Sequence, residues 1–248
     1  ASSGPSGGPL PVDSLELVLA LIVTFVAALI QGSIGFGFNI LSVPVLALVD
    51  PVLAPVPQLV VSFPLALASL VRERDEVDVR GVAWILAGRV PGALVGIGLL
   101  AIATDRFLDV LMAAFVLLAV VFFAAGRAVS RSRPVDFTAG VFSGTTGAVA
   151  SMGGPPLALL FAGEKGPRLR ATLAAVFAIG VTMSIAARGA AGEISWDEIV
   201  MGGLLIVPAA LAFLVSNRLL ARVDGAVIRF GVLALSTTAA LGLLVRAL

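Results

Sequence analysis

Two clusters of glycine and polar residues interrupt otherwise apolar sequence, and their residue types suit the binding of an anion. The first cluster runs from Gln31 to Asn39, and the second from Ser143 to Pro156. Glycine allows a positive φ and lets a ligand approach the backbone closely. A helix that restarts after such a break presents unpaired N–H groups and a partial positive charge, which attract anions. We therefore predict an anion site where the two breaks meet.

The candidate substrate-binding residues are the glycines of the breaks, the polar side chains beside them and one arginine. They are Gln31, Ser33, Gly35, Gly37, Asn39, Arg89, Gly144, Thr145, Thr146, Gly147, Ser151, Gly153 and Gly154. Small residues also serve as packing positions between transmembrane helices, which is the alternative interpretation. Arg89 lies inside a long apolar segment, so it either faces a cavity or extends to the nearby membrane surface.

Composition identifies an integral, multi-pass membrane protein. The 248 residues are 59% hydrophobic and 12% charged, and the mean hydropathy is +1.12. A net charge of +1 gives no electrostatic support to a nucleic-acid partner. Cysteine, histidine and tyrosine are absent, and every carboxylate lies near a segment end. We therefore expect no metal, no cofactor and no enzymatic activity, and we expect no cationic substrate.

Two similar halves follow a short N-terminal tail. An offset of about 117 residues places Gly37 close to Gly153 and Pro91 on Pro208, which indicates an internal duplication. We predict a flexible tail over 1–13, a first repeat over 14–126, a cytoplasmic linker over 127–135 and a second repeat over 136–248. The expected fold is all-α: each repeat comprises a re-entrant or broken-helix hairpin, with short arms, and three transmembrane helices.

Basic residues concentrate in four loops, which predicts the orientation in the membrane. These loops are Arg72–Arg80, Arg127–Arg133, Lys165–Arg170 and Arg218–Arg222. The positive-inside rule places all four in the cytoplasm. Each half then crosses the membrane an odd number of times, so the halves are inverted and both termini lie outside. Arg246, at the outer C-terminus, is an exception to the rule.

The two breaks resemble those of the TauE/SafE family of sulfite and sulfonate exporters. The matching residues are Gly35, Gly37 and Pro44 in the first half, with Gly144, Gly147, Gly153 and Gly154 in the second. The resemblance covers 15–248, although Phe38 and Asn39 stand where many members carry further glycine. It implies transport of small sulfur oxyanions or organosulfonates across the bacterial inner membrane.

The function expected from the sequence is secondary transport of a small anion by alternating access. An anion channel could use the same site without two gates, and a non-transporting membrane subunit of a larger complex is a third class. The partners expected are a small anionic substrate and the lipid bilayer. The sequence allows a homo-oligomer but leaves the exact substrate, the coupling ion and the direction of transport open.

Overall fold

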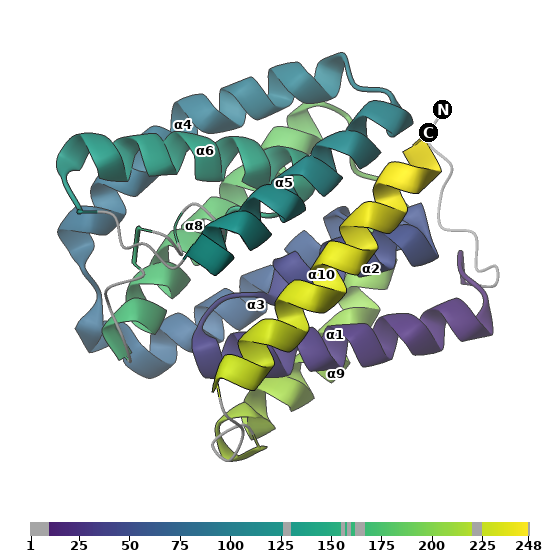
Figure 1. Cartoon of the computed structure of the whole chain (residues 1–248), viewed down its shortest axis with the longest axis horizontal. Coiled ribbons are helices and arrows are strands. Elements are labelled where there is room, and N and C mark those ends of the chain that lie inside the picture. The colour runs from purple at the N-terminus through teal and green to yellow at the C-terminus, as the bar shows by residue number, and fades with distance from the viewer. Residues whose placement is uncertain are drawn as a thin grey trace.

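The computed structural model describes residues 10–125, 130–154, 157, 160–161, 167–219 and 225–247. These residues form nine α-helices, two short 3₁₀ helices and no strand (Figure 1). The α-helices are α1 (Ser14–Ile34), α2 (Phe38–Val49), α3 (Val56–Glu73), α4 (Val79–Ala101), α5 (Asp105–Ala125), α6 (Arg133–Ala150), α8 (Pro167–Ala190), α9 (Trp196–Leu219) and α10 (Gly225–Ala247). The 3₁₀ helices are Pro51–Leu53 and Arg74–Glu76.

Five helical stretches are long and apolar enough to cross a bilayer, so the chain is a multi-pass membrane protein. They are Ser14–Ile34, Pro51–Glu76, Val79–Ala101, Pro167–Ala190 and Trp196–Ser216. Their outward faces carry exposed Leu, Ile and Val side chains, which suits contact with lipid rather than water. The prediction of an all-α membrane protein is therefore confirmed.

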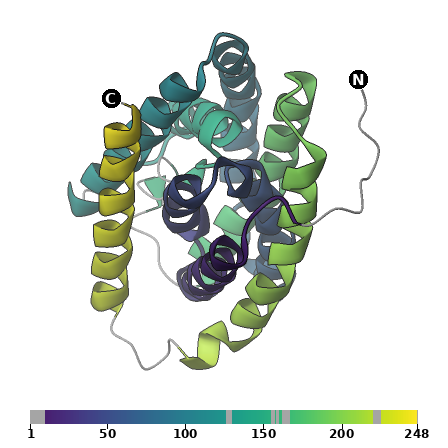
Figure 2. The same cartoon turned by 90° about the vertical axis from the view of Figure 1, so that its right-hand side faces the viewer.

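The first hairpin has one long arm and one short arm. Asp13 and Glu16 form a reciprocal capping box that begins α1. Gly35, with φ of 94°, ends α1, and Gly37, with φ of 111°, begins the 12-residue α2. Two short arms were expected from the sequence, but α1 has 21 residues, enough for a full crossing. Figure 2 shows this hairpin between α9 and α10.

The second break is shorter than the sequence predicted. Helix α6 continues to Ala150, so the glycines between Ser143 and Gly147 are helical rather than part of the break. The break itself falls at Ser151–Gly153. Helix α6 begins at Arg133, inside the predicted linker 127–135. The predicted tail up to residue 9, the last residue of the predicted first repeat (126) and linker residues 127–129 lie outside the described residues.

The glycines of α6 instead bring it into backbone contact with α4. A Cβ atom at Gly140 would lie 2.1 Å from the Ile85 carbonyl oxygen, and one at Gly144 would lie 2.5 Å from the Arg89 carbonyl oxygen. Helix α4 contributes a glycine to the same contact: a Cβ atom at Gly88 would lie 2.0 Å from the Phe137 carbonyl oxygen of α6. Only glycine permits this approach, which maximises van der Waals contact between two helices in lipid.

A cluster of charged side chains joins the starts of α4 and α6. Arg131 donates hydrogen bonds to Asp78 (2.8 Å) and to Asp136 (3.0 Å). Burial alone would raise the pKa of Asp78, but hydrogen bonds from the Gly81 N–H and from Arg131 outweigh it and hold the pKa below its usual value. Arg131 is thus anchored to the starts of both α4 and α6 at one end of the bundle.

The opposite end of the bundle holds the start of α1 and the end of α10, which lie on one side of Figure 1. Arg246, the exception to the predicted charge rule, forms a bidentate ion pair with Asp109 at the start of α5 (2.9 and 2.5 Å). It also donates to the Ala47 carbonyl oxygen at the end of α2. Because its charge is paired locally, Arg246 adds little net positive charge to this end.

Candidate functional site

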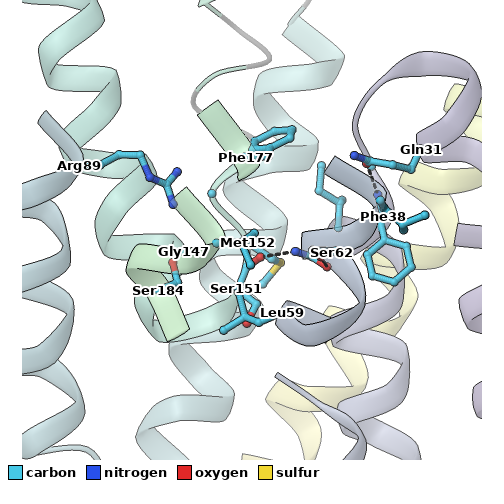
Figure 3. A pocket seen from close by; sticks show the side chains of 17 residues that line it. Gln31, Phe38, Leu59, Ser62, Arg89, Gly147, Ser151, Met152, Phe177 and Ser184 are labelled. Carbon is cyan, nitrogen blue, oxygen red and sulfur yellow. Dashed lines mark hydrogen bonds between the residues drawn. The ribbon is translucent and has the colours of Figure 1, made fainter. Parts of the chain in front are cut away.

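The two breaks line one cavity in the interior of the bundle (Figure 3). Its volume is about 40 Å³, several times the roughly 10–15 Å³ that one water needs. Residues of α1, α2, α3, α4, α6 and α8 and of both breaks surround it. They are Gln31, Gly37, Phe38, Asn39, Ile40, Leu59, Ser62, Leu65, Arg89, Gly147, Ser151, Met152, Gly153, Gly154, Phe177, Val181 and Ser184.

The first break presents the N-terminus of α2 to the cavity. Gly37 lacks a side chain that could cap this helix, and the Gln31 side chain supplies the missing acceptor: its Oε1 accepts a hydrogen bond from the Phe38 N–H (3.3 Å). Asn39 lies in the first turn, and its Oδ1 accepts a hydrogen bond from Ser62 of α3 (2.9 Å). The positive end of the α2 dipole therefore faces the cavity.

The second break meets the cavity from the α6 side. Asn39 donates a hydrogen bond from Nδ2 to the Ser151 carbonyl oxygen (2.6 Å), which links the two breaks directly. The Ser143 hydroxyl donates to the Gly153 carbonyl oxygen (2.5 Å) and fixes the backbone after Met152. Gly154 is helical. Residues 155 and 156, which end the second cluster, lie outside the described residues.

Arg89 projects from α4 toward the cavity (Figure 3), and its guanidinium lies in a socket made of glycines. Its guanidinium donates to the Ser143 hydroxyl (2.5 Å) and to the Gly180 carbonyl oxygen of α8 (3.1 Å). A Cβ atom at Gly147 or Gly153 would lie 2.9 or 2.8 Å from a guanidinium nitrogen, and one at Gly180 would lie 2.4 Å from Cζ. These glycines make the space that the guanidinium occupies.

Arg89 is 3% exposed, which excludes the alternative that it extends to the membrane surface. Helix α4 begins at Val79, so Arg89 lies about 15 Å along it, near its middle. Nε of Arg89 has no hydrogen-bond partner. No described carboxylate forms an ion pair with it, and none of the described residues that line the cavity is acidic. The site thus contains a buried positive charge without a countercharge among the described residues.

Two predicted site residues of the first half lie outside this lining. The Ser33 hydroxyl donates to the Ser216 carbonyl oxygen of α9 (3.2 Å). Gly35 lies against Arg170, because a Cβ atom there would lie 2.6 Å from the Arg170 Cγ. Both residues position α1 and its end rather than face the cavity.

Three predicted residues of the second half lie within α6 and take part in helix contacts. Gly144 packs against the α4 backbone. The Thr145 hydroxyl donates to the Gly92 carbonyl oxygen of α4 (3.0 Å), and that of Thr146 donates to the Phe142 carbonyl oxygen (2.9 Å). The other eight predicted residues line the cavity: Gln31, Gly37, Asn39, Arg89, Gly147, Ser151, Gly153 and Gly154.

Several lining residues were not among the predicted site residues. Ser62 on α3 and Ser184 on α8 contribute hydroxyl groups, and Phe38, Leu59 and Phe177 contribute to an apolar wall. Helix α3 is the first long helix after the first break, and α8 is the first long helix after the second break among the described residues. A small polar residue inside the first long segment after each break is the sequence signal that would have indicated them.

The helical bundle and the buried cavity between two broken segments define a polytopic membrane protein of the transporter class. A family model described as Sulfite exporter TauE/SafE matches residues 20–243. The chain therefore belongs to the TauE/SafE sulfite exporter family, which is a family of transporters rather than enzymes. No curated protein and no solved structure shows significant similarity to the chain.

Proposed function

We propose that this protein is a secondary transporter of small anions, with sulfur oxyanions or organosulfonates as its substrate class. The observation that carries the proposal is the buried Arg89 guanidinium, which lines the cavity with one nitrogen unpartnered. A buried charge without a partner is unfavourable by several kcal/mol. An anion in the cavity would supply the missing countercharge and the missing hydrogen-bond acceptor.

The backbone around the cavity favours the same sign of ligand charge. The N-terminus of α2 faces the cavity at Gly37 and Phe38, and its dipole adds a partial positive charge. Anion binding at a helix N-terminus is a general property of helices. Here the helix N-terminus is combined with the Arg89 guanidinium, a planar group that suits hydrogen bonding to two oxygen atoms of one anion. The described residues of the lining bring no carboxylate that would oppose an anion.

The shape and lining of the cavity suit a small substrate with a polar and an apolar end. Arg89 and the glycines of its socket form one side, and Leu59, Leu65 and Phe177 form an apolar wall. Sulfite fits the polar side alone. A sulfoacetate-like organosulfonate would place its sulfonate toward the guanidinium and its carbon atoms toward the wall.

We further propose that the two halves are inverted repeats and that transport proceeds by alternating access in the bacterial inner membrane. The support is the arrangement of the breaks, which approach one cavity from two parts of the sequence that match under the duplication. The start of α1 and the end of α10 lie at the end of the bundle opposite the one where Arg131 joins the starts of α4 and α6. This arrangement agrees with both termini outside, as the positive-inside rule requires.

A flux measurement on purified protein in liposomes tests the proposal. Sulfite, sulfate, thiosulfate, taurine and sulfoacetate should be offered in turn, and a carrier should show saturable uptake that is stimulated by substrate on the opposite side. Flux that does not saturate and shows no such stimulation would indicate an anion channel. Absence of flux and of binding for every anion would indicate a non-transporting membrane subunit.

A further inference from the structure

Ser151 has a backbone conformation that side chains other than glycine rarely adopt. Its φ is 58° and its ψ is 13°, and it is the only non-glycine residue with positive φ in the part of the chain that the structure describes. The spacing that relates Gly37 to Gly153 also relates Gly35 to Ser151. Gly35 ends α1 with φ of 94°, which glycine does without strain. A strained serine persists there only because its surroundings hold it.

Two hydrogen bonds, one with the start of α3 and one with the first turn of α2, hold Ser151 in place. Its hydroxyl donates to the Pro55 carbonyl oxygen at the start of α3 (2.9 Å). Its own carbonyl oxygen accepts from Asn39 in the first turn of α2 (2.6 Å). Ser151 therefore ties the end of α6 to the starts of two helices of the other half.

Ser151 lies between the site cavity and a second, larger cavity, which we call the vestibule. The vestibule has a volume of about 560 Å³ and is lined by residues of several helix ends and by the turn between α8 and α9. Ser151 lines the site cavity, whereas its hydrogen-bond partner Pro55 and its near neighbour Val149 line the vestibule. The hydrogen bond from Ser151 to Pro55 thus crosses the boundary between the two spaces, whereas the bond from Asn39 lies on the site-cavity side.

The last turn of α6 is fixed independently of Ser151. Arg188 of α8, which is 3% exposed, donates to the carbonyl oxygens of Ala148 (2.8 Å) and Val149. These bonds satisfy carbonyl groups that have no partner within the helix. Ser151 can therefore change conformation while α6 keeps its place.

We propose that Ser151 is the latch of a gate between the site cavity and the vestibule. The gate opens when the Ser151 hydroxyl leaves the Pro55 carbonyl oxygen and the backbone relaxes out of the left-handed region. Backbone strain lowers the barrier between the two states, because the closed conformation is held by two hydrogen bonds against an unfavourable φ. The inference deepens the proposed transport function, since a carrier needs a closable path on each side of its site.

Labelling of single cysteines tests the latch, because the native chain has no cysteine. Ser184→Cys places a thiol in the site cavity, and Ile194→Cys places one in the vestibule as a reference. An impermeant thiosulfonate reagent is applied to right-side-out and to inverted vesicles. The preparation in which the Ile194→Cys thiol reacts defines the vestibule side.

Ser151→Ala should raise the labelling rate of the Ser184→Cys thiol from the vestibule side by about 2- to 10-fold, the effect of one lost hydrogen bond on a two-state equilibrium. Alanine removes the hydroxyl and still disfavours a positive φ. Ser151→Gly removes the hydroxyl but fits the backbone, so its effect should be smaller. Thr138→Ala, which removes a hydroxyl from the exposed first turns of α6, should change nothing.

An unchanged rate in folded Ser151→Ala protein would overturn the proposal. An equal rise from both sides would overturn it too, because it would indicate general loosening rather than a gate. Ser151→Gly decides the case if the alanine variant does not fold, since glycine is compatible with the observed φ. No substrate is needed in this experiment, so a gate response together with absent anion binding would refute only the anion assignment.

Discussion

Replacing Arg89 with glutamine should weaken anion binding while leaving the bundle folded. Arg89 is the only charged residue among those described in the lining of the cavity, and glutamine keeps much of its length and some of its hydrogen-bonding capacity. The variant loses the hydrogen bonds to Ser143 and Gly180 but also removes a buried charge that has no ion-pair partner among the described residues, so the bundle should still fold. The larger effect should therefore appear in anion binding, with the stability of the ligand-free variant measured beside it.

The magnitude follows from the contacts that the guanidinium can offer. A hydrogen bond to a charged group contributes about 1.5–3 kcal/mol, so its loss should weaken binding by about 10- to 150-fold. Arg89→Lys should be intermediate, because an ammonium keeps the charge but cannot present two parallel N–H groups. Arg80→Gln removes an exposed arginine from the same helix and serves as the control.

Isothermal titration with sulfite, taurine and sulfoacetate measures the affinities, and thermal unfolding provides an independent check. At a ligand concentration of 100 times the wild-type Kd, bound ligand stabilises the wild type by about 2.7 kcal/mol. A variant with 100-fold weaker affinity would gain only about 0.4 kcal/mol under the same conditions. Equal affinity in Arg89→Gln and wild type would refute the assignment of Arg89 to the anion.

Three further predictions concern the break, the orientation and the charged cluster. Gly153→Val should abolish transport but not membrane insertion in a flux assay, because a side chain there meets the Arg89 guanidinium 2.8 Å away; near-normal flux would favour a packing role for this glycine. A thiol introduced at Ser132 should be shielded from an impermeant reagent in intact cells and one introduced at Gly192 should react, and the reverse pattern would overturn the topology. Arg131→Gln should lower the free energy of unfolding by about 1–3 kcal/mol near neutral pH. Arg131 contacts Asp78, whose pKa is lowered in the folded protein, so this difference in the free energy of unfolding should shrink as the pH falls below about 4. Unfolding curves recorded in detergent at several pH values would show this change.

Hydropathy and the positions of glycine sufficed to predict the membrane class and the two breaks. They did not suffice to predict the roles of individual glycines. Gly144 and Gly153 belong to the same cluster of glycine and polar residues, yet Gly144 packs α6 against α4, whereas Gly153 makes room for a guanidinium. Which surface a small residue faces depends on a partner helix distant in sequence. Composition within one segment therefore cannot separate packing from binding.

The environment of Arg89 shows a second limit of the sequence. An arginine near the end of an apolar segment is compatible with burial or with extension to the membrane surface. Helix α4 begins at Val79 and ends at Ala101, so Arg89 lies near its middle, and Gly180 of α8 completes the socket. The burial of Arg89 thus depends on a helix boundary and on a long-range contact, neither of which hydropathy reports.

The close backbone contact between α4 and α6 limits how the protein can move. Glycines on both helices place carbonyl groups where any side chain would collide, so sliding one helix along the other would bring larger residues into the same positions. Helices α4 and α6 therefore form a single rigid frame, which carries Arg89 on one member and the second break at the end of the other. Apart from the local change proposed at Ser151, any rearrangement that exposes the cavity to a new side has to occur between this frame and the helices around it. Distances measured from the frame, with probes on α4 or α6, would record which of the other helices move.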